Sequence, residues 1–253
     1  IELNKSNLQK KIQMSLILIT GAGRRIGRGL AINFAKKGWD IAINYNKSEK
    51  RAIETRDTCR EYGVKAEVFQ ADVSKKIEIV STINQIVEIL GVPDVLVNNA
   101  GIYPPKTELK DISEELIDET FAINLKGEFF TSQYFSQLAK PNSRIINIAS
   151  LGAFEVWKGR IPYHISKSAL VHLTKALSIE LAPNISVNCV CPGAIEVETD
   201  QENSSPLISV DKIPMKRYGN PEDIFDAVYF FATCTNYITG QTLIVDGGYH
   251  NSR

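Results

Sequence analysis

Short apolar runs alternate with amphipathic stretches along the chain from Ser15 onward. The runs are rich in Val and Ile, and the stretches between them repeat their apolar positions with the period of a helix. The runs predict seven strands, at 15–20, 41–45, 64–70, 94–99, 144–150, 185–191 and 241–247. Helices are predicted between them, at about 25–37, 48–62, 75–90, 113–120, 121–139, 162–182 and 221–233.

Strands that alternate with helices indicate βαβ units, and hence a parallel sheet with helices on both faces. Because crossovers are right-handed, the doubly wound topology is the economical one. No linker, charge block or internal repeat interrupts the alternation, so we expect residues 14–253 to form a single-domain α/β fold, a Rossmann-type, doubly wound, seven-stranded parallel sheet. Residues 1–13 are polar, and we expect them to be an N-terminal extension or a cloning remnant.

Composition excludes several classes of protein. The 253 residues hold 29 Lys+Arg and 29 Asp+Glu, so the chain has no net charge and no electrostatic reason to bind nucleic acid or an anionic membrane surface. No apolar run approaches the roughly 20 residues that span a bilayer. The four cysteines are scattered, which indicates a reduced, cytoplasmic protein. We expect no metal site. We expect Cys189 and Cys191 to be buried and to pack as small apolar residues.

A glycine-rich turn, TGAGRRIGRG at 20–29, follows the first predicted strand and opens the first predicted helix. In this position small residues let main-chain N–H groups approach a pyrophosphate at the positive end of the helix. A tight turn that merely needs glycine is the alternative. The turn residues assigned to a dinucleotide cofactor are Gly21, Gly23, Arg24, Arg25, Ile26 and Gly27.

The second predicted strand ends without the carboxylate that NAD-selective sites place there to bind the ribose 2′-hydroxyl. It is followed by Asn46, Lys47 and Ser48, which together with Arg24 would surround a 2′-phosphate through charge-assisted hydrogen bonds. Solvated surface cations are the alternative, but the balance favours NADP(H). The third and fourth predicted strands end in residues that would line the same crevice around the adenosine: Asp72, Val73, Asn99, Ala100 and Gly101.

Tyr163 and Lys167 stand four residues apart, on one face of a predicted helix. An ammonium group beside a phenol favours the phenolate, and so makes the phenol a better acid near neutral pH. A Tyr–Lys pair at this spacing is common in helices, and on its own it usually has only a packing role. Ser150, however, ends the preceding predicted strand, and its hydroxyl would polarise a substrate carbonyl from the other side. The three residues therefore predict chemistry on a carbonyl group.

Over about residues 15–250 the chain resembles the short-chain dehydrogenase/reductases. The motifs that carry the resemblance come in the family's order: the glycine turn, NNAG at 98–101, AINL at 122–125, Ser150, the Tyr163–Lys167 pair, PG at 192–193, ITGQ at 238–241 and DGG at 246–248. Within the family the chain is most similar to the 3-oxoacyl-[acyl-carrier-protein] reductases. Relatives in this family are mostly homotetramers, so we expect a homotetramer with pairwise helix interfaces by analogy.

The resemblance implies an NADP-dependent oxidoreductase that transfers a hydride to a small-molecule carbonyl substrate. It implies that Tyr163 donates the proton to the carbonyl and that Ser150 holds and polarises its oxygen. By the same resemblance, Lys167 binds the nicotinamide ribose and favours ionisation of Tyr163, while Asn124 positions a water of the proton relay. The nicotinamide carboxamide would be flanked by Pro192, Gly193 and Ile195.

Arg25 stands where the family's TGxxxGxG pattern has its second glycine. The substitution resembles the pteridine reductases, whose Arg reaches the cofactor phosphates and the pterin, and Tyr103 lies near their ring-stacking aromatic residue. Those enzymes commonly have Asp where Ser150 stands here. Reduction of a pterin is therefore the alternative to a 3-oxoacyl substrate. A non-catalytic NADPH-binding protein is a further alternative, which the presence of Tyr163 and Lys167 disfavours.

Other departures concern the substrate. The carrier-protein reductases dock an acidic partner through basic residues, of which Lys140 is present while the second place reads Pro183-Asn184. The segment that follows is acidic and would repel such a carrier, with Glu196, Glu198, Asp200 and Glu202. A carrier-linked substrate is thus not favoured.

Several further positions carry weaker signals. Val197 replaces a Thr that often binds the carboxamide, with Thr199 as a possible substitute. Phe154 and Trp157 fall between Ser150 and Tyr163, where they would wall a substrate pocket or anchor a core. The histidines lack metal-ligand spacing, and we expect them to pack or to lie at the surface.

Overall fold

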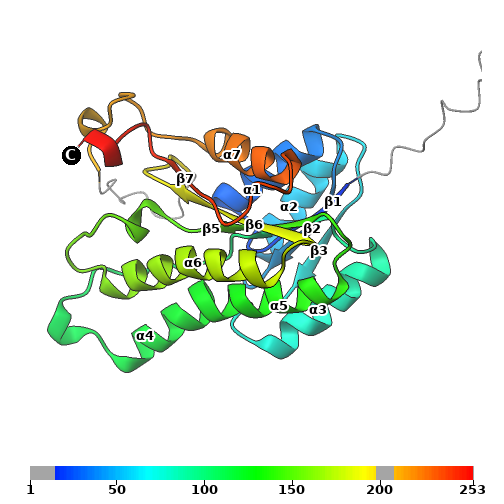
Figure 1. Ribbon diagram of the computed structural model, residues 1–253, viewed down its shortest axis with the longest axis horizontal. Helices are drawn as coiled ribbons and strands as arrows, with labels where there is room; N and C mark the ends of the chain where they lie inside the picture. The colour runs from blue at the N-terminus through cyan, green and yellow to red at the C-terminus, as the bar shows by residue number, and fades with distance from the viewer. Residues whose placement is uncertain (1–14, 198–207, 253) are drawn as a thin grey trace, which may run out of the picture.

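The computed structural model describes residues 15–197 and 208–252, so the predicted extension at 1–13 lies outside the described residues. Seven parallel strands form one sheet in the order β3-β2-β1-β4-β5-β6-β7, which confirms the predicted doubly wound sheet (Figure 1). The order reverses between β1 and β4, and ligands of such sheets bind at this switch point, outside the carboxyl ends of the strands. The strands are β1 (Leu16–Ile19), β2 (Asp40–Tyr45), β3 (Ala66–Gln70), β4 (Val95–Asn98), β5 (Ser143–Ile148), β6 (Ile185–Pro192) and β7 (Thr242–Val245).

Helices cover both faces of the sheet (Figure 1). One face carries α1 (Arg25–Lys36), α2 (Glu49–Arg60) and α7 (Pro221–Thr233). The other carries α3 (Lys76–Ile89), α4 (Glu114–Phe121), α5 (Glu128–Leu138) and α6 (Ile161–Glu180). Within the described ranges, none of the helices combines the length and the apolar character that crossing a membrane requires.

The strands are mostly apolar and lack a regular alternation of apolar and polar residues, because both faces of the sheet are covered. All four residues of β1 and all eight of β6 are buried. Successive side chains enter opposite cores: Ile17 and Ile19 pack with α1, α2 and α7, whereas Leu18 packs with α3, α5 and α6. The sheet therefore has no polar face on which a strand could slip its register.

The predicted helices at 113–120 and 121–139 require a correction. Between α4 and α5 the chain forms a π-helical segment, η3 (Ala122–Gly127). The side chain of Asn124 within it donates to the Ile102 carbonyl oxygen (3.0 Å) and accepts from the Ile102 N–H (2.8 Å). Gly127 passes so close to the segment after β3 that a Cβ would lie 2.7 Å from the Val73 carbonyl oxygen. These contacts are distant in sequence, so the local hydrophobic period could not reveal the wider turn.

Phe34 of α1 lies at the centre of the core beneath α1 and α7. Its side chain is fully buried, and its ring centroid lies 5.1 Å from those of Trp39 and Phe225 and 5.8 Å from that of Tyr229. The ring pairs are edge-on or tilted, the arrangement that aromatic quadrupoles favour. Phe34 thus joins the helix that follows the glycine turn to the helix at the far end of the chain.

Replacing Phe34 by Ala is expected to lower the free energy of unfolding by about 3–5 kcal/mol, because it removes a buried ring and leaves a cavity. Tyr237→Ala is the matched control, since Tyr237 is 96% exposed. Its stability is expected to stay within about 0.5 kcal/mol of the native value. Urea unfolding followed by circular dichroism measures both, and equal losses in the two variants would contradict the central position of Phe34.

Candidate active site

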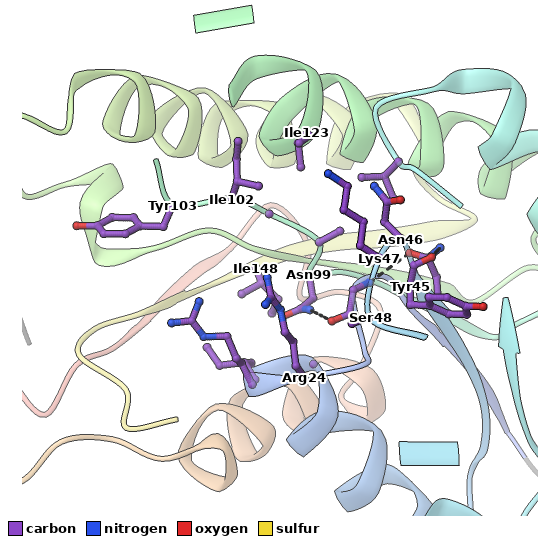
Figure 2. Close-up of a pocket in the computed structure, with 18 of the residues that line it drawn as sticks. Arg24, Tyr45, Asn46, Lys47, Ser48, Asn99, Ile102, Tyr103, Ile123 and Ile148 are labelled. Atoms are coloured by element: carbon purple, nitrogen blue, oxygen red, sulfur yellow. Dashed lines mark hydrogen bonds between the residues drawn. The ribbon is translucent and has the colours of Figure 1, made fainter. Parts of the chain in front are cut away.

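A cavity of about 910 Å³ lies at the carboxyl ends of β1 to β6. Figure 2 shows Tyr103 at one end of it and Tyr45, Asn46 and Lys47 at the other, with Arg24 between them. The cavity is lined by the predicted cofactor residues except Gly23, and by Ser150, Tyr163 and Lys167. The structure therefore gathers residues from six strand ends into one site, as the doubly wound topology predicts.

The glycine turn is held tightly against the segment after β4. Gly21 has a φ of 64°, and a Cβ on it would lie 2.9 Å from the Ala100 Cα. The Asn99 side-chain amide donates to the carbonyl oxygens of Thr20 (2.9 Å) and Gly21 (3.2 Å). A Cβ on Gly27 would lie 2.5 Å from the Gly21 carbonyl oxygen. Glycine is needed at these positions because the main chains approach too closely for a side chain. The main chain of the turn is then available to bind a phosphate group.

Gly23 does not line the cavity, but it packs against a residue that does. A Cβ on Gly23 would lie 2.8 Å from the Ser48 hydroxyl oxygen. Ser48 itself lines the cavity at the start of α2. Gly23 thus sets how closely the segment after β2 approaches the glycine turn, and so how the cations of the two segments are spaced.

Arg25 begins α1 with a φ of 55°, in the left-handed region that favours glycine. An L-residue with a Cβ is strained there by roughly 1–2 kcal/mol. Its side chain lines the cavity. The left-handed backbone at this position explains why the family's pattern has glycine there. In this protein Arg25 adopts the same backbone conformation with strain, and its side chain is exposed.

Cations cluster where β2 ends. Arg24 and Lys47 are exposed and line the cavity, and Lys50 and Arg51 join them there although the sequence did not single them out. One carboxylate is also present: Glu49 lines the cavity and accepts a hydrogen bond from the Tyr45 hydroxyl (3.4 Å). The signal for the additional cations was their place in the first turn of the helix after β2.

Asp72 follows β3 and lines the cavity next to Val73. One of its carboxylate oxygens accepts hydrogen bonds from the Ser74 N–H (2.9 Å) and hydroxyl (2.7 Å). Burial opposes its ionisation, but these hydrogen bonds and the charge of Lys75 lower the pKa of Asp72 below its usual value. A hydrogen bond with the Asn46 side chain also lowers this pKa, so Asp72 is a carboxylate.

Ser150, Tyr163 and Lys167 all line the cavity. Ser150 follows β5, and its hydroxyl oxygen accepts from the Gly152 N–H (3.0 Å), which leaves the hydroxyl proton to donate elsewhere. Lys167 is 4% exposed, and its Nζ donates to the Ile148 carbonyl oxygen (2.8 Å). Tyr163 lies one helical turn before Lys167 on α6.

Asn124 is fully buried and lies behind the cavity lining. A Cβ on Gly101 would lie 3.3 Å from the Asn124 Oδ1 and 3.6 Å from the Lys167 Nζ, so the segment after β4 passes beside both side chains. Asn124 also donates to the Ser166 hydroxyl on α6 (3.2 Å). Its amide thus joins η3, the NNAG segment and α6, and it places the main chain of η3 next to Lys167.

His164 was expected to pack or to lie at the surface, and the structure shows a more definite arrangement. The side chain is buried, its Nε2 accepts from the Trp157 N–H (3.0 Å), and its Nδ1 lies 2.7 Å from the Gly152 carbonyl oxygen. The contacts fit a neutral imidazole with its proton on Nδ1. His164 ties α6 to η4 (Leu151–Ala153), the turn that follows Ser150.

The three residues predicted to contact the substrate, Tyr103, Phe154 and Trp157, do not lie together in the structure. Tyr103 lines the cavity, and its ring meets that of Tyr163 edge-on, with centroids 4.6 Å apart. Trp157 packs against His164 at 5.1 Å and in a core with Leu151, and Phe154 is exposed. Neither Phe154 nor Trp157 belongs to the cavity lining that residues 15–197 and 208–252 define.

Nothing in the described part of the chain groups three or more His, Cys, Asp or Glu side chains as a metal site. Cys189 and Cys191 are buried on one face of β6 with their sulfur atoms 3.8 Å apart, and both are free thiols. Val197 lines the cavity. The acidic positions Glu198, Asp200 and Glu202, and Thr199, lie outside the described residues.

A doubly wound sheet, a glycine turn after β1 and a basic crevice at the switch point define a dinucleotide-binding protein. Comparison with known proteins narrows the class. The chain matches a family model described as enoyl-(acyl carrier protein) reductase over residues 21–250. An uncharacterized oxidoreductase of Thermotoga maritima is 36% identical over 249 residues, covering 93% of this chain and 97% of that protein.

Two further relatives sharpen the comparison. A 3-oxoacyl-[acyl-carrier-protein] reductase of Staphylococcus epidermidis is 36% identical over 237 residues, covering 91% of this chain and 97% of that protein. A solved short-chain dehydrogenase of Burkholderia cenocepacia, in complex with NADP, is 30% identical with a TM-score of 0.88, covering 93% of this chain and 98% of that one. The chain belongs to the short-chain dehydrogenase/reductase family and is similar to its 3-oxoacyl-[acyl-carrier-protein] reductases.

Arg25→Gly is expected to raise the free energy of unfolding by about 0.5–1 kcal/mol, because relief of the left-handed strain exceeds the extra chain entropy that glycine loses on folding. Arg28→Gly, within the helical part of α1, is the matched control. It is expected to lower that free energy by about 1 kcal/mol. Urea unfolding measures both, and a destabilised Arg25→Gly variant would show that side-chain contacts of Arg25 outweigh its backbone strain.

Proposed function

We propose that this protein is an NADPH-dependent oxidoreductase that reduces a small-molecule carbonyl, with Tyr163 as the proton donor. The observation that carries the proposal is that Ser150, Tyr163 and Lys167 line the same cavity as the residues assigned to the cofactor. Membership of the short-chain dehydrogenase/reductase family supports the reaction class. A non-catalytic NADPH-binding protein would have no need for a buried lysine beside a cavity-lining tyrosine.

NADP(H) is the cofactor that the cavity fits. The glycine turn packs directly against Ala100 at the cavity, and Arg24, Lys47 and Ser48 line the part of the cavity that we assign to the 2′-phosphate. The Burkholderia cenocepacia relative was solved in complex with NADP. Pro192, Gly193 and Ile195 line the end of the cavity assigned to the nicotinamide. When bound, this cofactor supplies the hydride.

The residues of the chain supply the proton and hold the substrate oxygen. Because the Ser150 oxygen already accepts from Gly152, its hydroxyl proton is directed to the substrate carbonyl. Tyr163 donates its proton to the same oxygen as negative charge develops there. The ammonium of Lys167, one helical turn away, stabilises the phenolate that results. Asn124 holds η3 against Lys167, where a relay water would be placed.

A 3-oxoacyl group is the substrate class best supported, through similarity to the Staphylococcus epidermidis 3-oxoacyl-[acyl-carrier-protein] reductase. The position of Tyr103 favours a planar substrate as a second candidate, such as a pterin. Its ring lines the cavity next to Tyr163, and the Arg160 guanidinium lies 4.2 Å from its centroid. Arg25 would then contact that ligand rather than the cofactor phosphates alone.

NADPH oxidation, measured in parallel with a short 3-oxoacyl thioester and with dihydrobiopterin, tests the substrate. Turnover of the thioester is expected, with NADPH preferred to NADH. Turnover of the pterin alone would overturn the 3-oxoacyl assignment and make Arg25 and Tyr103 substrate residues. Preference for NADH would overturn the role given to Arg24 and Lys47.

Tyr163→Phe is expected to lower kcat by about 10²–10⁴-fold, because it removes the general acid and keeps the ring. The dissociation constant for NADPH, measured by fluorescence titration, is expected to stay within about threefold of the native value. His172→Phe on the same helix is the control for packing of α6. Near-native turnover by Tyr163→Phe would contradict the proposed chemistry.

The exposed apolar side chains support assembly as a homotetramer. α5 and α6 expose Phe129, Ile165 and Ile179, and α7 and β7 expose Phe230 and Leu243. These positions fit two separate pairwise interfaces. Analytical ultracentrifugation is expected to show a tetramer that Ile179→Glu converts to smaller species, since a charge would be buried at one interface. A monomeric native protein would contradict the assembly.

A further inference from the structure

Glu128 is a buried carboxyl that the chemistry proposed above does not use. It begins α5, directly after η3, and is 2% exposed. Its Oε1 lies 3.5 Å from the Nζ of Lys167. Within the described residues its Oε2 is buried without a hydrogen-bond partner. An unpaired buried carboxyl oxygen is costly, so a purely structural residue would be an expensive choice at this position.

The groups around Glu128 come from three elements. α6 presents Lys167, whose Nζ is anchored by the Ile148 carbonyl oxygen at 2.8 Å. β6 presents the thiol of Cys189, and β4 presents Asn98, whose amide lies 3.5 Å from the Glu128 main-chain carbonyl oxygen. The hydrogen bond to Cys191, together with burial, raises the pKa of Cys189 well above its usual value, so this thiol is neutral. Lys167 is therefore the charge that Glu128 faces.

The ionisation of the pair follows from its burial. Burial raises the pKa of Glu128 to about 8, against the attraction of Lys167. Burial opposes the charge on Lys167 too, but the attraction of the ionised forms of Glu128 and Tyr163 outweighs it and raises the pKa of Lys167 above its usual value. Below about pH 8 a neutral carboxyl thus faces an ammonium group, and above that pH a carboxylate faces it.

We propose that Glu128 is a positioning residue that sets how much of the Lys167 charge acts on Tyr163. A neutral Glu128 leaves the ammonium free to favour the phenolate, whereas an ionised Glu128 offsets that charge from the opposite side. Tyr163 and Lys167 lie one helical turn apart, and Glu128 touches Lys167 from α5. The proposal rests on the proton-donor role given to Tyr163, and it makes the acidity of that phenol depend on a third residue.

Glu128→Gln keeps the shape of the side chain and removes its charge. In the full-length protein, the basic limb of the kcat/KM profile for reduction is expected to move to lower pH, because the ammonium would act on Tyr163 without opposition. One pH unit above the native midpoint, kcat/KM is expected to fall about three- to tenfold relative to the native protein. Glu88→Gln is the matched control, since Glu88 is exposed on α3 and makes the same change of charge.

A second measurement needs neither substrate nor cofactor. A carboxyl whose folded pKa lies above its unfolded pKa stabilises the fold fully below the unfolded value, and loses that contribution as pH rises through the folded value. The native protein is therefore expected to lose thermal stability relative to Glu128→Gln between about pH 5 and pH 8, the range between those two pKa values. Glu88→Gln is expected to run parallel to the native protein.

Unchanged midpoints in Glu128→Gln, with only a lower plateau, would overturn the proposal and leave Glu128 a structural residue. If Glu128→Gln does not fold, Glu128→Asp and infrared titration of the native protein replace it. Loss of a protonated-carboxyl band between pH 7 and pH 9 supports the proposal, and a carboxylate already present at pH 6 overturns it. Because the stability and infrared measurements do not involve Tyr163, failure of the proton-donor role would show separately, in Tyr163→Phe.

Discussion

The burial of one positive charge, that of Lys167, is the constraint on which the site depends. An ammonium group loses its hydration when it is 4% exposed, so it needs acceptors supplied by the fold. The Ile148 carbonyl oxygen supplies one at 2.8 Å, because β5 ends there and its last carbonyl turns toward α6. Glu128 supplies the other, from the point where η3 returns to an α-helix. The π-helical segment and the end of β5 are therefore parts of the lysine site.

Buried amides hold the two halves of the sheet together at the switch point. Asn98 at the end of β4 donates to the Asn147 side chain on β5 (2.9 Å), and Asn147 donates to the Thr174 hydroxyl on α6 (2.9 Å). Asn99 and Asn124 use their amides on main-chain oxygens of the glycine turn and of Ile102. Buried side-chain donors that are paired in this way favour one arrangement of a core, because a shift would leave them unpaired. They connect the cofactor cradle to the wall that carries Tyr163.

The fold and most of the site could be predicted from the sequence because their signals are local. Val- and Ile-rich runs mark buried parallel strands, the glycine turn marks the first strand end, and a pair such as Tyr163 and Lys167 needs only helical spacing. Other features depend on tertiary contacts. η3 requires Asn124 to reach Ile102 across the chain, and His164 acquires its role only when η4 folds back onto α6. Glu128 carried no signal in the sequence, since nothing in its own segment indicates that the lysine on α6 lies beside it.

Net charge and local charge give different answers, and the difference explains how a neutral protein holds an anionic cofactor. The 29 basic and 29 acidic residues cancel over the chain, so there is no long-range field to attract polyanions. Around the cavity, however, Arg24 and Arg25 from the glycine turn meet Lys47, Lys50 and Arg51 from the start of α2, with Glu49 as the opposing charge among them. The two segments are separate in sequence, but they lie together at one edge of the cavity because β1 and β2 are neighbouring parallel strands. In this pairing Leu16 lies beside Asp40. The field is therefore short in range and confined to the neighbourhood of the cavity. The sequence contained these charges, but only the order of the strands shows that they act together.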